Sequence, residues 1–158
     1  ITQAVLPVLR RQGAGHLLQV TSEGGVRAYP SFGAYHASKW AVEGLTEALA
    51  QETAGFGFHV TMVEPGPYAT GFAGALRQSE ALPDYAQAHI DTATDFRLGD
   101  PAATVPAVLA LVDAENPPRR LVMGDVLPEI ESVYRERLAT WREWGDVSAA
   151  AFGARVPQ

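Results

Sequence analysis

Cysteine and long apolar runs are both absent from this sequence of 158 residues. Without cysteine the chain cannot form disulfide bonds, use a thiolate in catalysis or hold zinc through thiolates, and this absence is compatible with a reducing cytosol. A membrane-spanning helix needs about 20 predominantly apolar residues in a row. The longest apolar runs are far shorter, so we expect a cytoplasmic protein without a membrane span.

Basic residues are scarce as well. Twelve lysines and arginines stand against 18 aspartates and glutamates, the net charge is -6, and no block of like charge occurs. Such a chain is poorly suited to bind nucleic acid or an anionic membrane surface. His16, His59 and His89 have no spacing typical of a zinc site, so we expect no metal. Lys39 is the only lysine, which raises the question of a chemical use for it.

Glycine and proline divide the chain into alternating helical and strand patterns. Short β-rich segments predict strands at residues 16–22, 58–65 and 119–124. Helical patterns cover residues 1–11, 33–54, 100–113 and 129–144. This alternation predicts an α/β fold with a parallel sheet, in which ligands bind beyond the carboxyl ends of the strands. Ser22 and Pro65 mark two such ends, and the irregular residues 68–98 suit a lid over a site.

The long helical segment 33–54 has many small residues at spacings of three and four. We expect its face of alanines to pack closely on the sheet: Ala34, Ala37, Ala41 and Ala48. Trp40 does not fit on that face together with the other large apolar residues, so apolar surface is left over. A contact between two copies of the helix would bury it, which predicts a homo-oligomer.

Tyr35 and Lys39 lie four residues apart in this helix, so their side chains share one face a turn apart. At an effective dielectric of about 20, a positive charge about 4 Å away stabilises a phenolate by about 4 kcal/mol. Lysine suits this task because it is a compact point charge with three donors. Ser22, thirteen positions before Tyr35, would bring its hydroxyl to the same crevice.

These residues resemble the catalytic pattern of the classical short-chain dehydrogenases/reductases. Two further motifs agree in register. The family's Ser-Ser-x-x-Gly strand end is matched by Thr21-Ser22-Glu23-Gly24-Gly25, and its Pro-Gly-x-x-x-Thr by Pro65-Gly66-Pro67-Tyr68-Ala69-Thr70. The resemblance implies a Rossmann-like doubly wound parallel sheet and hydride transfer between a nicotinamide cofactor and a carbonyl or alcohol substrate.

The resemblance also implies roles for individual residues. Tyr35 would be the general acid/base, Lys39 would assist it and bind the nicotinamide ribose, and Ser22 would orient the substrate oxygen. Pro65, Gly66 and Thr70 would contact the cofactor. The residues expected near the substrate are Gly25, Tyr68 and Phe72. NADP(H) is favoured as cofactor, NAD(H) is possible, and the family implies homodimers or homotetramers.

Other parts of the family pattern are missing. The glycine-rich TGxxxGxG turn, the ribose-reading position and the Asn-Asn-Ala-Gly stretch do not occur in this chain. We therefore expect residues 1–158 to be the C-terminal part of a single domain whose N-terminal half, roughly 90 to 120 residues, is missing. A non-catalytic nucleotide-sensing or scaffold protein that kept the fold is the alternative function.

Overall fold

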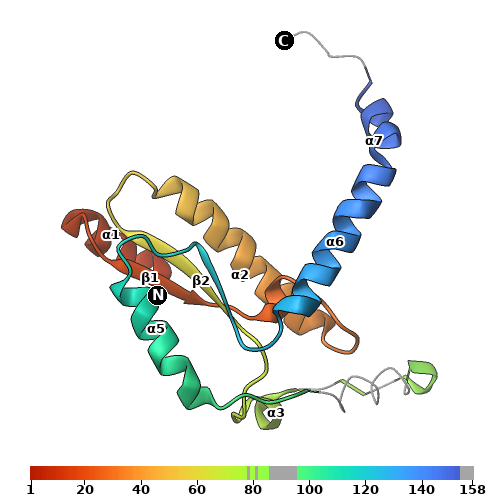
Figure 1. Ribbon diagram of the computed structural model, residues 1–158, viewed down its shortest axis with the longest axis horizontal. Coiled ribbons are helices and arrows are strands. Elements are labelled where there is room, and N and C mark those ends of the chain that lie inside the picture. The colour runs from red at the N-terminus through yellow and green to blue at the C-terminus, as the bar shows by residue number, and fades with distance from the viewer. Residues whose placement is uncertain (78, 81, 86–95, 154–158) are drawn as a thin grey trace. The chain divides into compact units, whose positions relative to one another are not determined.

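The computed structural model describes residues 1–77, 79–80, 82–85 and 96–153. Its chain divides into two units, one of residues 1–126 and a helical one that starts at Leu127. The first unit is built on a parallel sheet with the strand order β1-β2-β3. The strands are β1 (His16–Val20), β2 (His59–Pro65) and β3 (Arg120–Met123) (Figure 1). Each predicted strand is confirmed, with bounds that differ by a few residues.

Helices and short 3₁₀ turns precede and connect the strands of the first unit. The helices are α1 (Thr2–Gln12), α2 (Gly33–Glu52), α3 (Phe72–Ala75) and α5 (Thr104–Asp113). The 3₁₀ turns are η1 (Glu23–Gly25), η2 (Pro83–Tyr85) and η3 (Pro101–Ala103). The segment predicted to be helical from residue 100 begins with the 3₁₀ turn η3. Asp100 caps this turn, because its Oδ1 atom accepts a hydrogen bond from the Ala102 N–H at 2.9 Å. Part of the segment predicted as a lid, residues 78, 81 and 86–95, lies outside the described residues, and His89 is among them.

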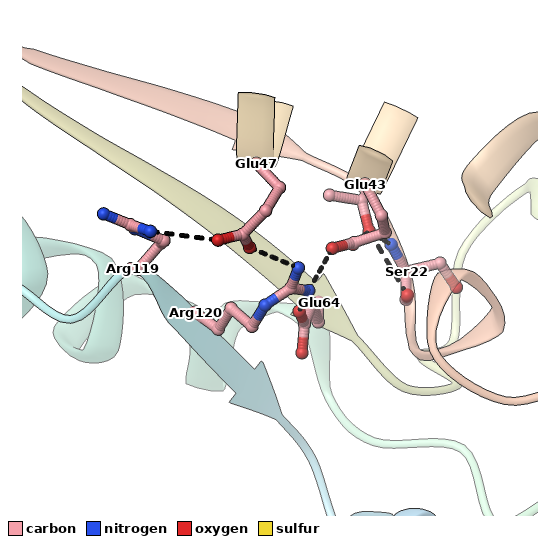
Figure 2. Close-up of polar contacts among 7 residues, drawn as sticks. Ser22, Glu43, Glu47, Glu64, Arg119 and Arg120 are labelled. Carbon is pink, nitrogen blue, oxygen red and sulfur yellow. Dashed lines mark hydrogen bonds and ion pairs between the residues drawn. The ribbon is translucent and has the colours of Figure 1, made fainter. Parts of the chain in front are cut away.

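Helices lie on both faces of the sheet. On one face, Val63 packs with Met123 and with Leu111 of α5 in a buried apolar cluster. The next residue along β2, Glu64, points to the opposite face because side chains alternate along a strand. On that face it belongs to a polar network with Glu43 of α2 (Figure 2). The predicted doubly wound α/β arrangement is confirmed.

One prediction about α2 is wrong. The alanines expected to face the sheet, Ala34, Ala37, Ala41 and Ala48, are all exposed. The buried residues of the helix are instead His36, Glu43, Thr46 and Ala50. Polar side chains can occupy this face because strand ends and loops supply hydrogen-bond partners for them, as described below for His36 and Glu43. The alanine stripe is left on the outer side of the helix.

The second unit contains α6 (Leu127–Glu143), which was predicted, and α7 (Gly145–Phe152), which was not. A glycine such as Gly145 is typical of a helix end. Here α6 ends at Glu143, and after the single residue Trp144 the chain becomes helical again. The Trp144 N–H still reaches the Thr140 carbonyl at 3.0 Å, and the Trp144 carbonyl accepts from Ser148 at 2.9 Å. Across the described residues, no helix combines the length and apolar character needed to cross a membrane.

Candidate active site

Tyr35 and Lys39 lie on one face of the first turns of α2, as their spacing predicts. The Lys39 Nζ atom is 5.8 Å from the centroid of the Tyr35 ring. Both side chains are partly exposed. Among the described residues, no carboxylate forms an ion pair with Lys39 and no group hydrogen-bonds to the Tyr35 hydroxyl. The described part of the chain therefore leaves both the phenol and the ammonium without a polar partner of these kinds.

Ser22 follows the carboxyl end of β1 and caps η1. Its Oγ accepts a hydrogen bond from the Gly24 N–H at 3.0 Å. The same hydroxyl points to the Pro65 carbonyl at 3.4 Å, which is long for an O–H···O bond. One Oγ lone pair is thus held by the Gly24 N–H, whereas the hydroxyl proton can turn to a better acceptor at little cost.

Gly24 brings the Ser22 loop against the Tyr35 ring. A Cβ atom at position 24 would lie 2.9 Å from Tyr35 Cε1 and 3.0 Å from His36 Nδ1. Such contacts are too short for any side chain, so glycine allows the loop to approach α2 this closely. The Gly24 N–H also donates to Ser22 Oγ. Gly24 therefore lies in contact with both the Ser22 hydroxyl and the Tyr35 ring.

His36 fixes the same loop from the helix side. Its Nε2 atom lies 3.1 Å from the Tyr29 N–H, which can only donate, so Nε2 must accept. The proton then resides on Nδ1, which donates to the Gly24 carbonyl at 2.9 Å. The imidazole is buried with both nitrogens satisfied. It supports the Ser22 loop and is not placed to react.

The residues predicted to contact cofactor follow β2. The Gly66 N–H donates to the Met123 carbonyl at 2.8 Å, and so continues the pairing of β2 with β3. Thr70 is exposed, and its Oγ1 accepts from the Phe72 N–H at 3.3 Å. Tyr68 forms an isolated bridge to Gly99. These contacts place residues 65–70 at the carboxyl end of the sheet, where Ser22 also lies.

Two of the predicted substrate residues have contrasting surroundings. Phe72 stands 5.3 Å from Tyr35 between ring centroids, in an edge-to-face arrangement, and it is 45% exposed. Gly25 is buried, and a Cβ atom there would lie 2.8 Å from Glu43 Cγ and 3.2 Å from the Lys39 carbonyl oxygen. Gly25 thus packs against α2, and its contact with substrate stays a prediction.

A network of charged side chains beside Ser22 was not predicted. It joins α2, β2 and β3 through Glu43, Glu47, Glu64, Arg119 and Arg120 (Figure 2). Arg120 binds Glu64 at 2.8 Å and Glu47 at 2.7 Å. No local sequence signal identifies these partners, because Arg120 is 77 residues from Glu43. Only the register of β2 and β3 brings them together.

Within the network, the pKa values of Glu47 and Glu64 are shifted in opposite directions. Hydrogen bonds from Arg120 and Arg119 lower the pKa of Glu47. Burial raises the pKa of Glu64, which is 2% exposed, although Arg120 opposes the shift. Within the described part of the chain, no group of three side chains suited to hold a metal ion occurs.

The chain matches known proteins along most of its length. Residues 1–81 match the family model described as short chain dehydrogenase. An oxidoreductase of Botryotinia fuckeliana, BOA17, is 34% identical over 159 residues, covering 96% of this chain and 58% of that protein.

Solved structures of short-chain dehydrogenases are similar to this chain in fold as well as in sequence. A short-chain dehydrogenase from Streptomyces avermitilis superposes with a TM-score of 0.83 at 36% identity, covering 94% of this chain and 56% of that one. One from Burkholderia cenocepacia in complex with NADP has a TM-score of 0.64 at 25% identity, covering 89% and 51%. The chain therefore spans little more than half the length of these relatives. The sequence motifs, the sheet and these matches together show that the chain belongs to the short-chain dehydrogenase family.

Proposed function

We propose that this chain carries the catalytic residues of a nicotinamide-dependent oxidoreductase that interconverts a carbonyl and an alcohol. The observation that supports this best is the Tyr35–Lys39 pair, 5.8 Å apart between ring centroid and Nζ, beside the Ser22 loop. A phenol, an ammonium and a hydroxyl at the carboxyl edge of a parallel sheet suit proton transfer to a substrate oxygen.

The chain's own residues fit a nicotinamide nucleotide. Lys39 has three donors and no carboxylate partner among the described residues, which suits ribose hydroxyls. Pro65 is the last residue of β2, Gly66 follows it directly, and the exposed Thr70 lies four residues further on. NADP(H) is the favoured cofactor, supported by the relative that binds NADP, and NAD(H) is the alternative. When bound, the nicotinamide would supply or accept the hydride.

In the proposed reaction Ser22 donates a hydrogen bond to the substrate oxygen and orients it. Tyr35 would give its phenolic proton to that oxygen during carbonyl reduction, which leaves the Tyr35 phenolate and completes the alcohol hydroxyl. In the reverse direction the Tyr35 phenolate takes the proton back. Lys39 stabilises the phenolate by its positive charge in both directions.

The surroundings of Tyr35 favour an apolar substrate. The Phe72 and Phe32 rings stand 5.3 Å and 6.1 Å from Tyr35, both edge-to-face. Tyr29 packs on Phe32 at 5.4 Å and on Phe96 at 5.6 Å, which extends the aromatic surface. Exposed rings beside a reacting hydroxyl bind apolar groups well. Phe72, Tyr68 and Gly25 are the residues we propose to contact the substrate.

The test is the variant Tyr35→Phe, which removes only the reacting hydroxyl. We expect carbonyl reduction by the intact protein, with NADPH or NADH and a panel of aliphatic and aromatic carbonyl compounds, to fall by roughly 100-fold or more. Lys39→Arg keeps the charge but changes its shape, and should lose roughly tenfold or more. Tyr134→Phe in α6 is the matched control and should retain activity.

Normal turnover by Tyr35→Phe would disprove the assignment. A protein that binds NADP(H) but reduces none of these compounds would favour the alternative of a nucleotide-sensing or scaffold role. A homodimer or homotetramer and a cytoplasmic location belong to the same proposal.

A further inference from the structure

Glu43 is a buried carboxylate that connects three elements. It lies on α2, one turn after Lys39, and is 5% exposed. Its Oε1 accepts a hydrogen bond from the Thr21 hydroxyl, and its Oε2 accepts one from Arg120 of β3 (Figure 2). Both carboxylate oxygens therefore have partners, as a buried charge requires.

The contact with Thr21 continues to Ser22. The Ser22 N–H donates to Thr21 Oγ1, whose own proton goes to Glu43. The Thr21 N–H is bound to the Val63 carbonyl at 2.8 Å, so the end of β1 is also fixed to β2. The backbone of Ser22 is thus two hydrogen bonds away from a carboxylate on the helix that carries Tyr35 and Lys39.

Arg120 holds the carboxylate from the other side. Besides Glu43 it binds Glu64 at 2.8 Å and Glu47 at 2.7 Å. A guanidinium with a fixed fork of donors orients several carboxylates at once. Because the helix, β2 and β3 all supply partners, rotation of Glu43 away from Thr21 would break contacts on several elements.

Gly25 lets the Ser22 loop pack closely against α2 at Glu43. A Cβ atom there would lie 2.8 Å from Glu43 Cγ and 3.2 Å from the Lys39 carbonyl oxygen. The loop that starts at Ser22 is therefore in contact with the same turn of α2 that spans Lys39 to Glu43. A shift of the Glu43 side chain would move this loop.

We propose that Glu43, held by Arg120 and acting through Thr21, is a positioning residue that keeps Ser22 in register with Tyr35 and Lys39. The proposal rests on the proposed function of these three residues. Glu43 does not touch the reacting atoms. Its effect is on the distance and orientation of the Ser22 hydroxyl relative to the phenol.

The test compares Glu43→Gln with Glu47→Gln in the intact protein. Both changes remove a carboxylate partner of Arg120, but only Glu43 binds Thr21. The glutamine amide has only one oxygen, whereas the Thr21 hydroxyl and the Arg120 guanidinium each donate to a different oxygen of the Glu43 carboxylate. We expect Glu43→Gln to lower kcat by roughly 10- to 100-fold because Ser22 is misplaced. Glu47→Gln should keep kcat within about twofold.

A second measurement does not depend on turnover. We expect hydrogen–deuterium exchange of peptides that cover residues 21–26 to be faster in Glu43→Gln than in the wild type or in Glu47→Gln, at a temperature where all three are folded. Unchanged kcat or unchanged exchange in Glu43→Gln would overturn the proposal. An equal loss of kcat in Glu47→Gln would also overturn it, because the effect would then be a general one on folding.

Thr21 provides variants that remain informative if Glu43→Gln does not fold. Thr21→Val removes the hydroxyl at nearly constant volume, and Thr21→Ser keeps it. We expect Thr21→Val to lose activity and loosen residues 21–26, and Thr21→Ser to retain both. Equal behaviour of the two would overturn the proposal. Normal turnover by Tyr35→Phe would instead defeat the proposed function, and the exchange data would still decide whether Glu43 holds the Ser22 loop.

Discussion

At the scale of single residues, Gly24 shows how closely the site is packed. Its position is too narrow for a Cβ atom, since Tyr35 Cε1 would lie 2.9 Å away. Gly24→Ala should displace the Tyr35 ring and reduce kcat/KM by roughly tenfold or more, with the protein still folded. The measurement is steady-state carbonyl reduction.

Gly55→Ala is the matched control for this prediction. Position 55 follows the end of α2 and has no atom within 4 Å of an added Cβ, so activity should be unchanged. A Gly24→Ala protein with wild-type kcat/KM would contradict the close contact between the Ser22 loop and Tyr35.

The sequence predicts these residues to different degrees. Tyr35, Lys39 and Ser22 are close in the chain, and a helical spacing of four preceded by a strand end is enough to bring them to one place. The partners of Glu43 could not be predicted in this way. They depend on the pairing of Met62 with Arg120 across β2 and β3, which no local pattern specifies.

At the scale of elements, α2 shows why a hydrophobic pattern identifies a helix more reliably than its buried face. The pattern located the helix within two residues of its C-terminal end. It placed the alanines on the sheet, because apolar residues are usually the buried ones. In this helix His36 and Glu43 are buried because distant groups satisfy their polar atoms. A buried polar face cannot be recognised without those partners.

The opposite pKa shifts of Glu47 and Glu64 predict a stability dependence on pH for the network that joins α2, β2 and β3. The pKa of Glu47 lies below its ordinary value of 4.5 in the folded protein. Its unfolded form then binds more protons, so its contribution is present above pH 4.5 and lost as the pH falls below it. The pKa of Glu64, which faces Arg120 and Glu43, lies above 4.5. Its folded form binds more protons, so stability is lost as the pH rises from 4.5.

Urea unfolding of wild type, Glu47→Gln and Glu64→Gln at several pH values checks this prediction. We expect the advantage of the wild type over Glu64→Gln to shrink as the pH rises above 4.5, and its advantage over Glu47→Gln to shrink as the pH falls below 4.5. Parallel curves for the two variants would contradict the assigned directions.

At the scale of the whole molecule, the outer side of α2 predicts assembly. Leu45 is 70% exposed and lies on the stripe of exposed alanines, and Trp40 is 41% exposed nearby on the helix. A flat apolar helix face of this kind suits an isologous contact with a second copy. We expect light scattering to show a homodimer or homotetramer, and Leu45→Arg to shift it to smaller species.

Leu109→Arg is the control, since Leu109 is exposed on α5 at the other face of the sheet. Dissociation by Leu109→Arg and not by Leu45→Arg would place the contact elsewhere and refute an interface through α2. A monomeric wild type at micromolar concentration would refute assembly altogether.

The bond between Glu43 and Arg120 also has a consequence for the order in which the chain folds. Ser22, Tyr35 and Lys39 can come together once β1, η1 and α2 have formed. The buried carboxylates Glu43 and Glu64, however, do not gain their bonds to Arg120 until β3 joins the sheet, across 77 and 56 residues of chain. Contacts of such long range slow folding. The early part of this chain therefore cannot complete its native packing before β3 joins the sheet.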